Sequence, residues 1–150
     1  MNNIQIRNYQ PGDFQQLCAI FLRAVTMTAS QHYSPQQIAA WAQIDESRWK
    51  EKLAKSQVRV AVINAQPVGF ITRIGHYIDM LFVDPEYTRR GVASALLKPL
   101  IKSESELTVD ASITAKPFFE RYGFQTVKQQ CVECRGAWFT NFYMRYKPQH

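Results

Sequence analysis

Apolar positions in the first third of the chain recur with the spacing of amphipathic helices. Residues 4–7 alternate as in a short strand, and the turn 11–13 places Asp13 where it can cap a following helix. One apolar stripe then runs from Phe14 to about Met27 and predicts that helix. Shorter helices are predicted over residues 34–41, with Ser34-Pro35 at the start, and over residues 45–53.

From residue 58 onward the period of the pattern changes from about four to two. Residues 58–63 and 68–74 are predicted strands, joined as a hairpin by the turn at 64–67. A third strand is predicted over 76–83. Its segment Ile78-Asp79-Met80-Leu81-Phe82-Val83 is almost wholly apolar, which is typical of a central strand covered on both faces.

The remaining pattern alternates strands and helices. A loop over 84–90 leads into a predicted helix over 91–102, followed by a strand over 107–110 and a helix over 115–122. Two long antiparallel strands then fill 124–147 and turn near Gly136. The order predicts an α+β fold with a mixed, mostly antiparallel central sheet of about seven strands, flanked by helices. No repeat or linker interrupts it, so we expect one domain over 1–150.

Composition places the chain among globular proteins with a basic surface. It has 150 residues, of which 46% are hydrophobic and 20% charged, and this excludes a disordered polyelectrolyte. The formal net charge is +6, so the sequence predicts an anionic partner. The candidates are nucleic acid, an anionic membrane and a small molecule with several phosphates.

Two of these partners are disfavoured by the sequence. The apolar run Leu17 to Leu22 stops at Arg23, so it is too short to span a bilayer and lacks the flanks of a signal peptide. We therefore expect a cytoplasmic protein without membrane association. No DNA or RNA module is recognisable, so no nucleic acid partner is expected.

The three cysteines do not indicate a metal site or a disulfide framework. They are odd in number, and no secretory signal precedes them, which favours reduced thiols. Cys131 and Cys134 are three apart on a predicted strand and so point to opposite faces, with no second cysteine pair. We expect no bound metal, and the sequence assigns these two cysteines no role.

A basic turn between a strand and a helix favours the phosphate-bearing partner. In LFVDPEYTRRGVASALLKPL an apolar strand runs into a turn with Arg89, Arg90 and Gly91 and then into an amphipathic helix. The first amides of a helix lack intrahelical acceptors, and a glycine lets a pyrophosphate approach the backbone. The segment lacks the endings of a Walker loop and the three glycines of a dinucleotide-binding fingerprint.

This segment resembles the pyrophosphate-binding signature of the GNAT superfamily of acetyl-CoA-dependent N-acyltransferases, Gln/Arg-x-x-Gly-x-Gly/Ala. Gly91 and Ala93 fall on its two small positions, and Thr88 stands where Gln or Arg is usual. Downstream, ASITAKPFFERYGF resembles the family segment Asn-x-x-Ala-x-x-Phe-Tyr-Glu-x-x-Gly-Phe. The resemblance implies a GNAT-like sheet with a V-shaped splay between the strand ending at Val83 and the strand Leu107 to Asp110.

The same resemblance implies acetyl-CoA as cosubstrate. The pantetheine arm would lie in the splay and pair with the backbone of the first strand, and the pyrophosphate would meet the amides of the turn and helix start. The implied cofactor-binding residues are Leu81, Phe82, Val83, Arg89, Arg90, Gly91, Val92, Ala93, Ser94 and Phe119.

The family's proton donor is replaced in this chain. Phe119 stands at the position of the usual Tyr, and Ser112 at that of the usual Asn. Tyr122, three residues beyond Phe119 and roughly on the same helix face, is our first choice for the acid, with packing beside Gly123 as its structural alternative. Ser112 could donate a hydrogen bond or cap the next helix. Thr140 and Tyr143 are weaker candidates, and solvent could also protonate the thiolate.

For the base we select Asp79, a carboxylate inside an apolar strand, since relatives often place an acid there. The alternative is a structural acid satisfied by a neighbouring strand or by Arg73. His76 could act through a water, but it and His32 also fit ordinary surface positions.

Aromatic and apolar residues of the N-terminal helices are the candidate acceptor-binding residues. Many of them also fit an ordinary core. They are Phe21, Met27, Tyr33 and Trp41, together with His32, and Trp138 of the last predicted strands joins them. No acidic cluster accompanies them, which argues against a polycationic acceptor.

The resemblance thus predicts an N-acetyltransferase that moves an acetyl group from acetyl-CoA directly to an amine of a small molecule or a protein in a ternary complex. The alternative is a non-catalytic CoA-binding regulatory or partner-binding domain, since Phe119 and Ser112 depart from the family pattern. The sequence does not determine the oligomeric state, and a homodimer is compatible with it.

Overall fold

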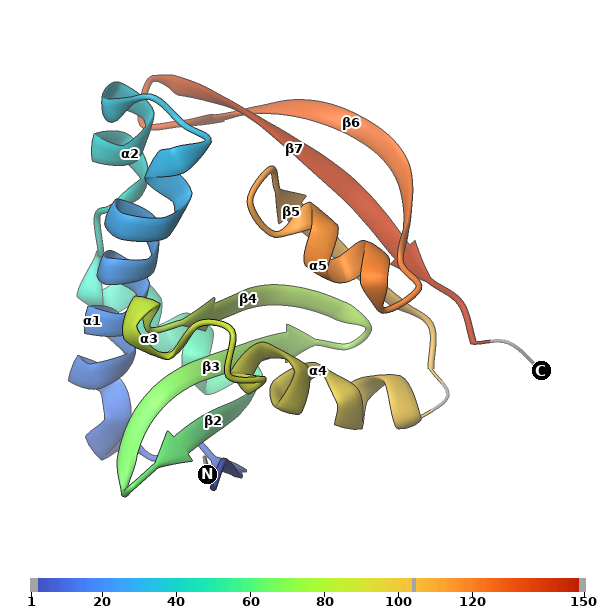
Figure 1. The fold of residues 1–150 in the computed structure, drawn as a ribbon. Helices are drawn as coiled ribbons and strands as arrows, with labels where there is room; N and C mark the ends of the chain where they lie inside the picture. Colours follow the sequence, from blue (N-terminus) through green and yellow to red (C-terminus); the bar gives the residue numbers. More distant parts are fainter. Residues whose placement is uncertain (1–2, 104, 149–150) are drawn as a thin grey trace.

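The computed structural model describes residues 3–103 and 105–148, which contain one seven-stranded sheet (Figure 1). Its strands are β1 (Gln5–Asn8), β2 (Gln57–Ile63), β3 (Gln66–Ile74), β4 (Tyr77–Val83), β5 (Leu107–Ser112), β6 (Gln125–Cys134) and β7 (Ala137–Tyr146). Their order in the sheet is β1-β2-β3-β4-β5-β7-β6. β4 and β5 run parallel and the other neighbours antiparallel, which confirms the predicted mixed, mostly antiparallel α+β fold.

The first helix is shorter than its apolar stripe predicted. α1 (Phe14–Arg23) passes into a π-helical turn, η2 (Ala24–Thr28), and a 3₁₀ turn, η3 (Ala29–Gln31). The Thr26 hydroxyl donates to the carbonyl of Leu22 at 2.7 Å, a side-chain bond that competes with regular helical pairing. The predicted end near Met27 is therefore close to the end of the π-helical turn, whereas the α-helical part ends earlier, at Arg23, and a 3₁₀ turn extends the helical run to Gln31.

Asp13 precedes α1 as predicted, but its side chain makes no cap hydrogen bond to that helix. It belongs to the preceding 3₁₀ turn, η1 (Pro11–Asp13), and accepts two hydrogen bonds from Arg7 of β1, at 2.7 and 2.9 Å. The backbone amide of Gln10 donates a third at 2.9 Å. The pair ties the first strand to the first helix and holds the pKa of Asp13 below its usual value, mainly through the hydrogen bonds from Arg7.

The next two helices begin at the predicted caps. α2 (Pro35–Trp41) starts after Ser34, whose hydroxyl accepts from the amide of Gln37, and α3 (Glu46–Lys55) starts after Asp45, whose carboxylate accepts from the amide of Arg48. Each capping side chain satisfies an amide that lacks an intrahelical acceptor.

The turns of the sheet use left-handed backbone conformations. Asn64 and Ala65 have φ of 50° and 64°, and they alone join β2 to β3, so the turn is tighter than the predicted 64–67. Arg135 and Gly136, with φ of 48° and 83°, join β6 to β7 where the sequence predicted a turn.

Helices cover both faces of the sheet, with a hydrophobic core on each. On one face α1, α2 and α3 pack on alternate residues of β2, β3, β4 and β7. On the other, α4 (Val92–Lys102) and α5 (Lys116–Arg121) pack on β2, β3, β4, β5 and β7 (Figure 1). A 3₁₀ turn, η4 (Pro85–Tyr87), leads from β4 toward α4.

One irregularity lies in β4. Ile78 packs in the core beneath α4 whereas Met80 packs in the core beneath α1, although period two would put both on one face. The register explains this: Arg73 faces Ile78 and Thr72 faces Met80, so Asp79 is an extra residue in a β-bulge. The bulge leaves the Asp79 carboxylate inside an otherwise apolar strand.

Candidate active site

The parallel strands β4 and β5 pair at their beginnings and then separate. Tyr77 faces Thr108 and Ile78 faces Val109, and within the described residues the register goes no further. β5 nevertheless continues beside β7 as far as Ser112. The two strands thus form the predicted V-shaped splay, which opens toward their carboxyl ends.

Past this point, one edge of β4 carries backbone groups directed into the gap. The amide of Asp84 donates to the carbonyl of Val68 at 2.8 Å, so this pair of residues is hydrogen-bonded across β3 and β4. Because such pairs alternate along antiparallel strands, Phe82 directs its backbone groups toward β3, and Leu81 and Val83 direct theirs toward the gap. An extended chain with amide groups can pair there as an added strand would.

The turn before α4 offers a second set of free backbone groups. Arg89 and Gly91 both have left-handed backbone angles, with φ of 64° and 81°, and Gly91 is the N-cap of α4. A Cβ on Gly91 would meet nothing within 4 Å, so the space above the helix start is open. Amides at the start of a helix, next to left-handed residues, form a concave site for an anion.

The side chains around this turn differ in what they can offer a phosphate. Arg89 and Arg90 are exposed, and the Arg90 guanidinium lies 5.1 Å from the centre of the Tyr87 ring. Val92 is 2% exposed and packs in the core, so its backbone amide is the group available to a ligand. Ala93 and Ser94 are half-buried on the first turn.

A cavity of about 520 Å³ begins in the splay and is lined from both sides of the sheet. Leu81, Ala111 and Phe119 belong to its wall on the side of α4 and α5. Phe82 and Phe139 belong to its wall on the side of α1 and α2. The cavity therefore connects the two faces of the sheet through the gap between β4 and β5.

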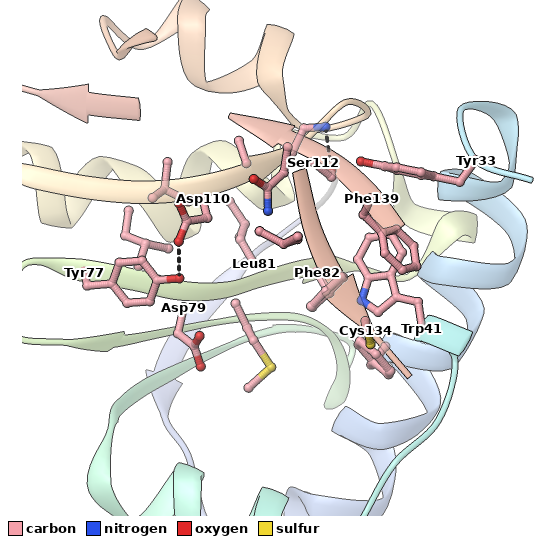
Figure 2. A pocket seen from close by; sticks show the side chains of 18 of the residues that line it. Tyr33, Trp41, Tyr77, Asp79, Leu81, Phe82, Asp110, Ser112, Cys134 and Phe139 are labelled. Atoms are coloured by element: carbon pink, nitrogen blue, oxygen red, sulfur yellow. Dashed lines mark hydrogen bonds between the residues drawn. The ribbon is translucent and has the colours of Figure 1, made fainter. Parts of the chain in front are cut away.

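On the side of α1, α2 and α3 much of the cavity wall is aromatic. The Phe21 ring lies 4.9 Å from that of Trp49 and 5.0 Å from that of Phe82, and the Tyr33 ring lies 5.7 Å from that of Trp41, each measured between centroids. Figure 2 shows Tyr33, Trp41, Phe82 and Phe139 gathered at this end. Rings in such edge-to-face contact make a rigid apolar wall.

Tyr33 also holds this end of the cavity together. Its hydroxyl donates to the carbonyl of Thr140 on β7 at 2.8 Å and accepts from the amide of Ile113 at 2.9 Å. It thereby joins the end of β5 to β7, where Thr140 takes part through its backbone.

The opposite end of the cavity is polar and contains Asp79. Lys52 of α3 places its Nζ 3.1 Å from Oδ2 of Asp79, and both residues line the cavity. The two groups form an ion pair, but the Lys52 ammonium is not aligned for a hydrogen bond to Oδ2. Oδ2 is therefore a buried oxygen with no hydrogen-bond donor among the described residues. Arg73, the alternative partner considered from the sequence, instead donates through Nε to Oε1 of Gln57 at 2.8 Å.

A second carboxylate faces the same polar end. The Tyr77 hydroxyl donates to Oδ2 of Asp110 at 2.9 Å (Figure 2), and Nε2 of Gln130 donates to Oδ1 of Asp110 at 2.7 Å. The same amide group lies 3.0 Å from Oδ1 of Asn141. Burial, followed by the bond to Asp110, raises the pKa of Tyr77 far above its ordinary value. Tyr77 is therefore a neutral hydrogen-bond donor at physiological pH.

The candidate proton donors occupy different places. Ser112 lines the cavity, and its Oγ accepts from the amide of Ala115 at 3.1 Å, which leaves its O–H free to donate. Tyr122 is absent from the cavity wall, and its hydroxyl donates to Oγ of Ser94 on α4. Phe119 is 2% exposed, and it contributes an apolar surface to the cavity.

Several predicted candidates lie apart from the cavity wall. Met27 and Trp138 are 57% and 59% exposed, and His76 is exposed before β4. Nδ1 of His32 lies 2.9 Å from Oγ1 of Thr114, and Tyr143 faces Asp110 in the register of β5 and β7 without lining the cavity. Of the four acceptor-binding candidates, Phe21, Tyr33 and Trp41 share the cavity and Met27 does not.

Sequence reasoning missed several of the cavity's polar and aromatic residues. Tyr77 and Asp110 could have been found, because a parallel start of the two splayed strands brings them together. No sequence pattern indicates that Lys52 and Trp49 line the cavity, since their positions depend on how α3 lies over β4.

Three further findings bear on the sequence-based expectations. Among the described residues no group of three or more His, Cys, Asp or Glu side chains could hold a metal ion. Cys18, Cys131 and Cys134 are free thiols. No helix in the described part of the chain is long and apolar enough to cross a membrane.

Comparison with known proteins gives one consistent result. A model of the acetyltransferase (GNAT) domain matches residues 29–146. The chain is 95% identical over the full length of both proteins to a protein of Escherichia coli named uncharacterized N-acetyltransferase YafP. It is 28% identical over 140 residues to the peptidyl-lysine N-acetyltransferase YjaB of the same species, covering 89% of this chain and 90% of YjaB.

A solved structure of a GCN5-related N-acetyltransferase from Rhodopseudomonas palustris superposes on the chain with a TM-score of 0.91 at 32% sequence identity. The match covers 95% of this chain and 94% of the other. The arrangement of the sheet and helices is therefore shared along nearly the whole chain.

Proposed function

Because this chain belongs to the GNAT acetyltransferases and is an acetyl-CoA-dependent acyltransferase, we propose that it transfers the acetyl group directly to an amine, with both substrates bound at once. The observation that carries this proposal is the cavity that connects the two faces of the sheet through the splay. One substrate can approach from each side, so the thioester and the amine can meet inside the gap.

Acetyl-CoA would lie on the side of α4. Its pyrophosphate would accept hydrogen bonds from the backbone amides of Arg89 to Ser94. The amides of its pantetheine arm would pair with Leu81 and Val83, whose backbone groups are directed into the gap. The residues present fit these groups, since the space above Gly91 is open and the gap is lined by apolar Leu81 and Phe119.

The amine would enter from the side of α1, α2 and α3. There the aromatic wall suits an apolar or aromatic body, and Asp79 and Asp110 suit its ammonium group. The acceptor is an amine of a small molecule or of a protein. The name of YjaB, a peptidyl-lysine N-acetyltransferase, supports a lysine side chain as one such acceptor.

In the reaction, Asp79 would take the proton of the ammonium group, which lets the neutral nitrogen attack the thioester carbon. Its buried Oδ2, which has no hydrogen-bond donor among the described residues, supports this role. The free O–H of Ser112 would donate a hydrogen bond to the departing sulfur, and Tyr122 remains the second candidate. Solvent would then supply the proton that completes CoA.

Two measurements test the proposal. Calorimetry should show acetyl-CoA binding to the native chain and no binding to Gly91→Glu, which places a carboxylate at the phosphate site. Release of CoA thiol should then be followed over a panel of alkyl amines, aryl amines and lysine peptides. Binding without turnover on any amine would contradict the proposal and support a non-catalytic CoA-binding domain, whereas undiminished binding by Gly91→Glu would remove the proposed cofactor site.

A further inference from the structure

Lys52 places a primary amine inside the proposed acceptor site. Among the residues that the structure describes, it is the lysine that lines the cavity, and its Nζ lies 3.1 Å from Oδ2 of Asp79, the proposed base. We infer that Lys52 is an acetylation site, modified by the acetyl-CoA that the same molecule binds. The inference rests on the proposed function, because it uses the same cavity and the same base.

The orientation of α3 separates Lys52 from the other lysines of that helix. Lys50 lies over the ring of Phe14, 5.1 Å from its centre, and Lys55 pairs with Glu51 at 2.9 Å. Leu53 is the buried residue of the helix and turns this part of α3 toward the sheet. Lys52 lies three residues after Trp49, which also lines the cavity, so the two share the helix face that is directed toward the cavity, while Lys55 remains at the surface.

The contact between Lys52 and Asp79 places a primary amine beside the proposed base. The Asp79 side chain is 17% exposed, and its Oδ2 has no aligned hydrogen bond in the described part of the chain. The Lys52 side chain is 47% exposed, so rotation about its flexible stem can move the amine within the cavity. An ammonium group next to a carboxylate can give up its proton there and then turn toward the splay.

The step balances without any further reactant. The Lys52 ammonium transfers one proton to Asp79, and the neutral nitrogen attacks the carbonyl carbon of the thioester. The carbon–sulfur bond breaks, the electron pair leaves with sulfur, and the nitrogen loses its second proton as the amide forms. The thiolate takes up one proton, so the products are acetyl-lysine, CoA and one proton released to solvent.

Because donor and acceptor belong to one complex, the reaction is intramolecular. Its rate per molecule should not depend on protein concentration. The high effective concentration of a tethered amine should make the rate faster than that of a lysine that must collide from solution. Acetylation removes the positive charge of Lys52 and with it the ion pair to Asp79.

The test is to incubate the purified full-length protein with acetyl-CoA that carries a deuterated acetyl group. This label separates new acetylation from any that was acquired during expression. Peptide mass spectrometry after digestion with a protease that does not cut at lysine gives the occupancy of Lys52 and Lys55 over time. We expect Lys52 to be labelled at least about tenfold faster than Lys55, which reports the chemical background on the same helix.

Two variants and a dilution series complete the experiment. Gly91→Glu should lose the excess labelling of Lys52 and retain that of Lys55, and Lys52→Arg should lose one label per molecule compared with Lys55→Arg. Labelling of Lys52 that is no faster than that of Lys55, or that persists in Gly91→Glu, overturns the inference. A rate per molecule that rises in proportion to protein concentration overturns the intramolecular step.

The outcomes also separate this inference from the proposed function. If amines of the panel release CoA while Lys52 stays at the background level, the inference fails and the proposed function stands. If neither Lys52 nor any external amine is acetylated although acetyl-CoA binds, both fail.

Discussion

The hydroxyl of Tyr77 donates a hydrogen bond of 2.9 Å to Oδ2 of Asp110, across the parallel strands β4 and β5 and at the point where they begin to separate. Gln130 of β6 donates to the other carboxylate oxygen. One carboxylate therefore connects β4 to the hairpin of β6 and β7, and it fixes the apex of the splay.

Tyr77→Phe should lower the free energy of unfolding by about 0.5–1.5 kcal/mol at neutral pH, because Asp110 loses one donor and keeps another. The pKa of Tyr77 is raised in the folded protein, so its contribution is complete below the unfolded value near pH 10 and is lost as the pH rises toward the folded value. Urea unfolding at pH 8 and above pH 10 should show the difference between native and variant shrinking at the higher pH. A constant difference, or an equal effect of Tyr143→Phe, would contradict this assignment.

Asp79→Asn should lower kcat by about 10²–10⁴-fold, since general base catalysis contributes about that much. The Kd for acetyl-CoA should change little, because Asp79 lies at the end of the cavity where the amine, not acetyl-CoA, is proposed to bind. Steady-state kinetics with an amine identified in the panel, together with calorimetry, measures both quantities. A kcat within threefold of the native value would exclude Asp79 as the base.

Ser112→Ala and Tyr122→Phe distinguish the two candidate donors to the sulfur. Ser112 lines the cavity, and its hydroxyl donates to no acceptor within residues 3–103 and 105–148, whereas that of Tyr122 donates to Ser94. We therefore expect Ser112→Ala to lower kcat by about tenfold, the worth of about one hydrogen bond, and Tyr122→Phe to lower it less. Ser94→Ala is the matched control, since it removes the partner of Tyr122 without touching its hydroxyl. A larger loss in Tyr122→Phe than in Ser112→Ala would assign the acid to Tyr122.

Asp13→Asn should destabilise the fold by about 1–3 kcal/mol at pH 7, because it removes a charge that accepts two hydrogen bonds from Arg7. The pKa of Asp13 is lowered in the folded state, so its contribution is present above the unfolded value near pH 4 and is lost as the pH falls through the folded value. Thermal or urea unfolding at pH 7 and pH 3 measures this. Glu51→Gln, which removes an exposed pair with Lys55, should cost less than about 0.5 kcal/mol at either pH, and an equal cost for both variants would refute the prediction.

Much of the fold follows from local patterns in the sequence. Ser34 and Asp45 cap the helices that they were expected to cap, and period two identifies β2, β3 and β4. The signature around Gly91 locates the turn before α4 in the same way. These features depend on residues that are near one another along the chain, so the sequence alone determines them.

The polar end of the cavity could be predicted only in part. Asp79 was selected as a carboxylate in an apolar strand, but its partner Lys52 comes from α3, and the bulge that admits it appears only in the register with β3. Asp110 and Tyr77 could be paired from the expected parallel start of the two strands, but Gln130, the second donor to Asp110, comes from β6. Contacts of this kind are set by tertiary packing and leave no periodic trace.

The open splay also bears on how the products leave. The cavity is lined from both faces of the sheet, so in the proposed arrangement each substrate lies on its own side of the gap. CoA would leave along α4, and the acetylated amine would leave between α1, α2 and α3. In this proposed arrangement neither product would have to pass the other, so we expect no obligatory order of release.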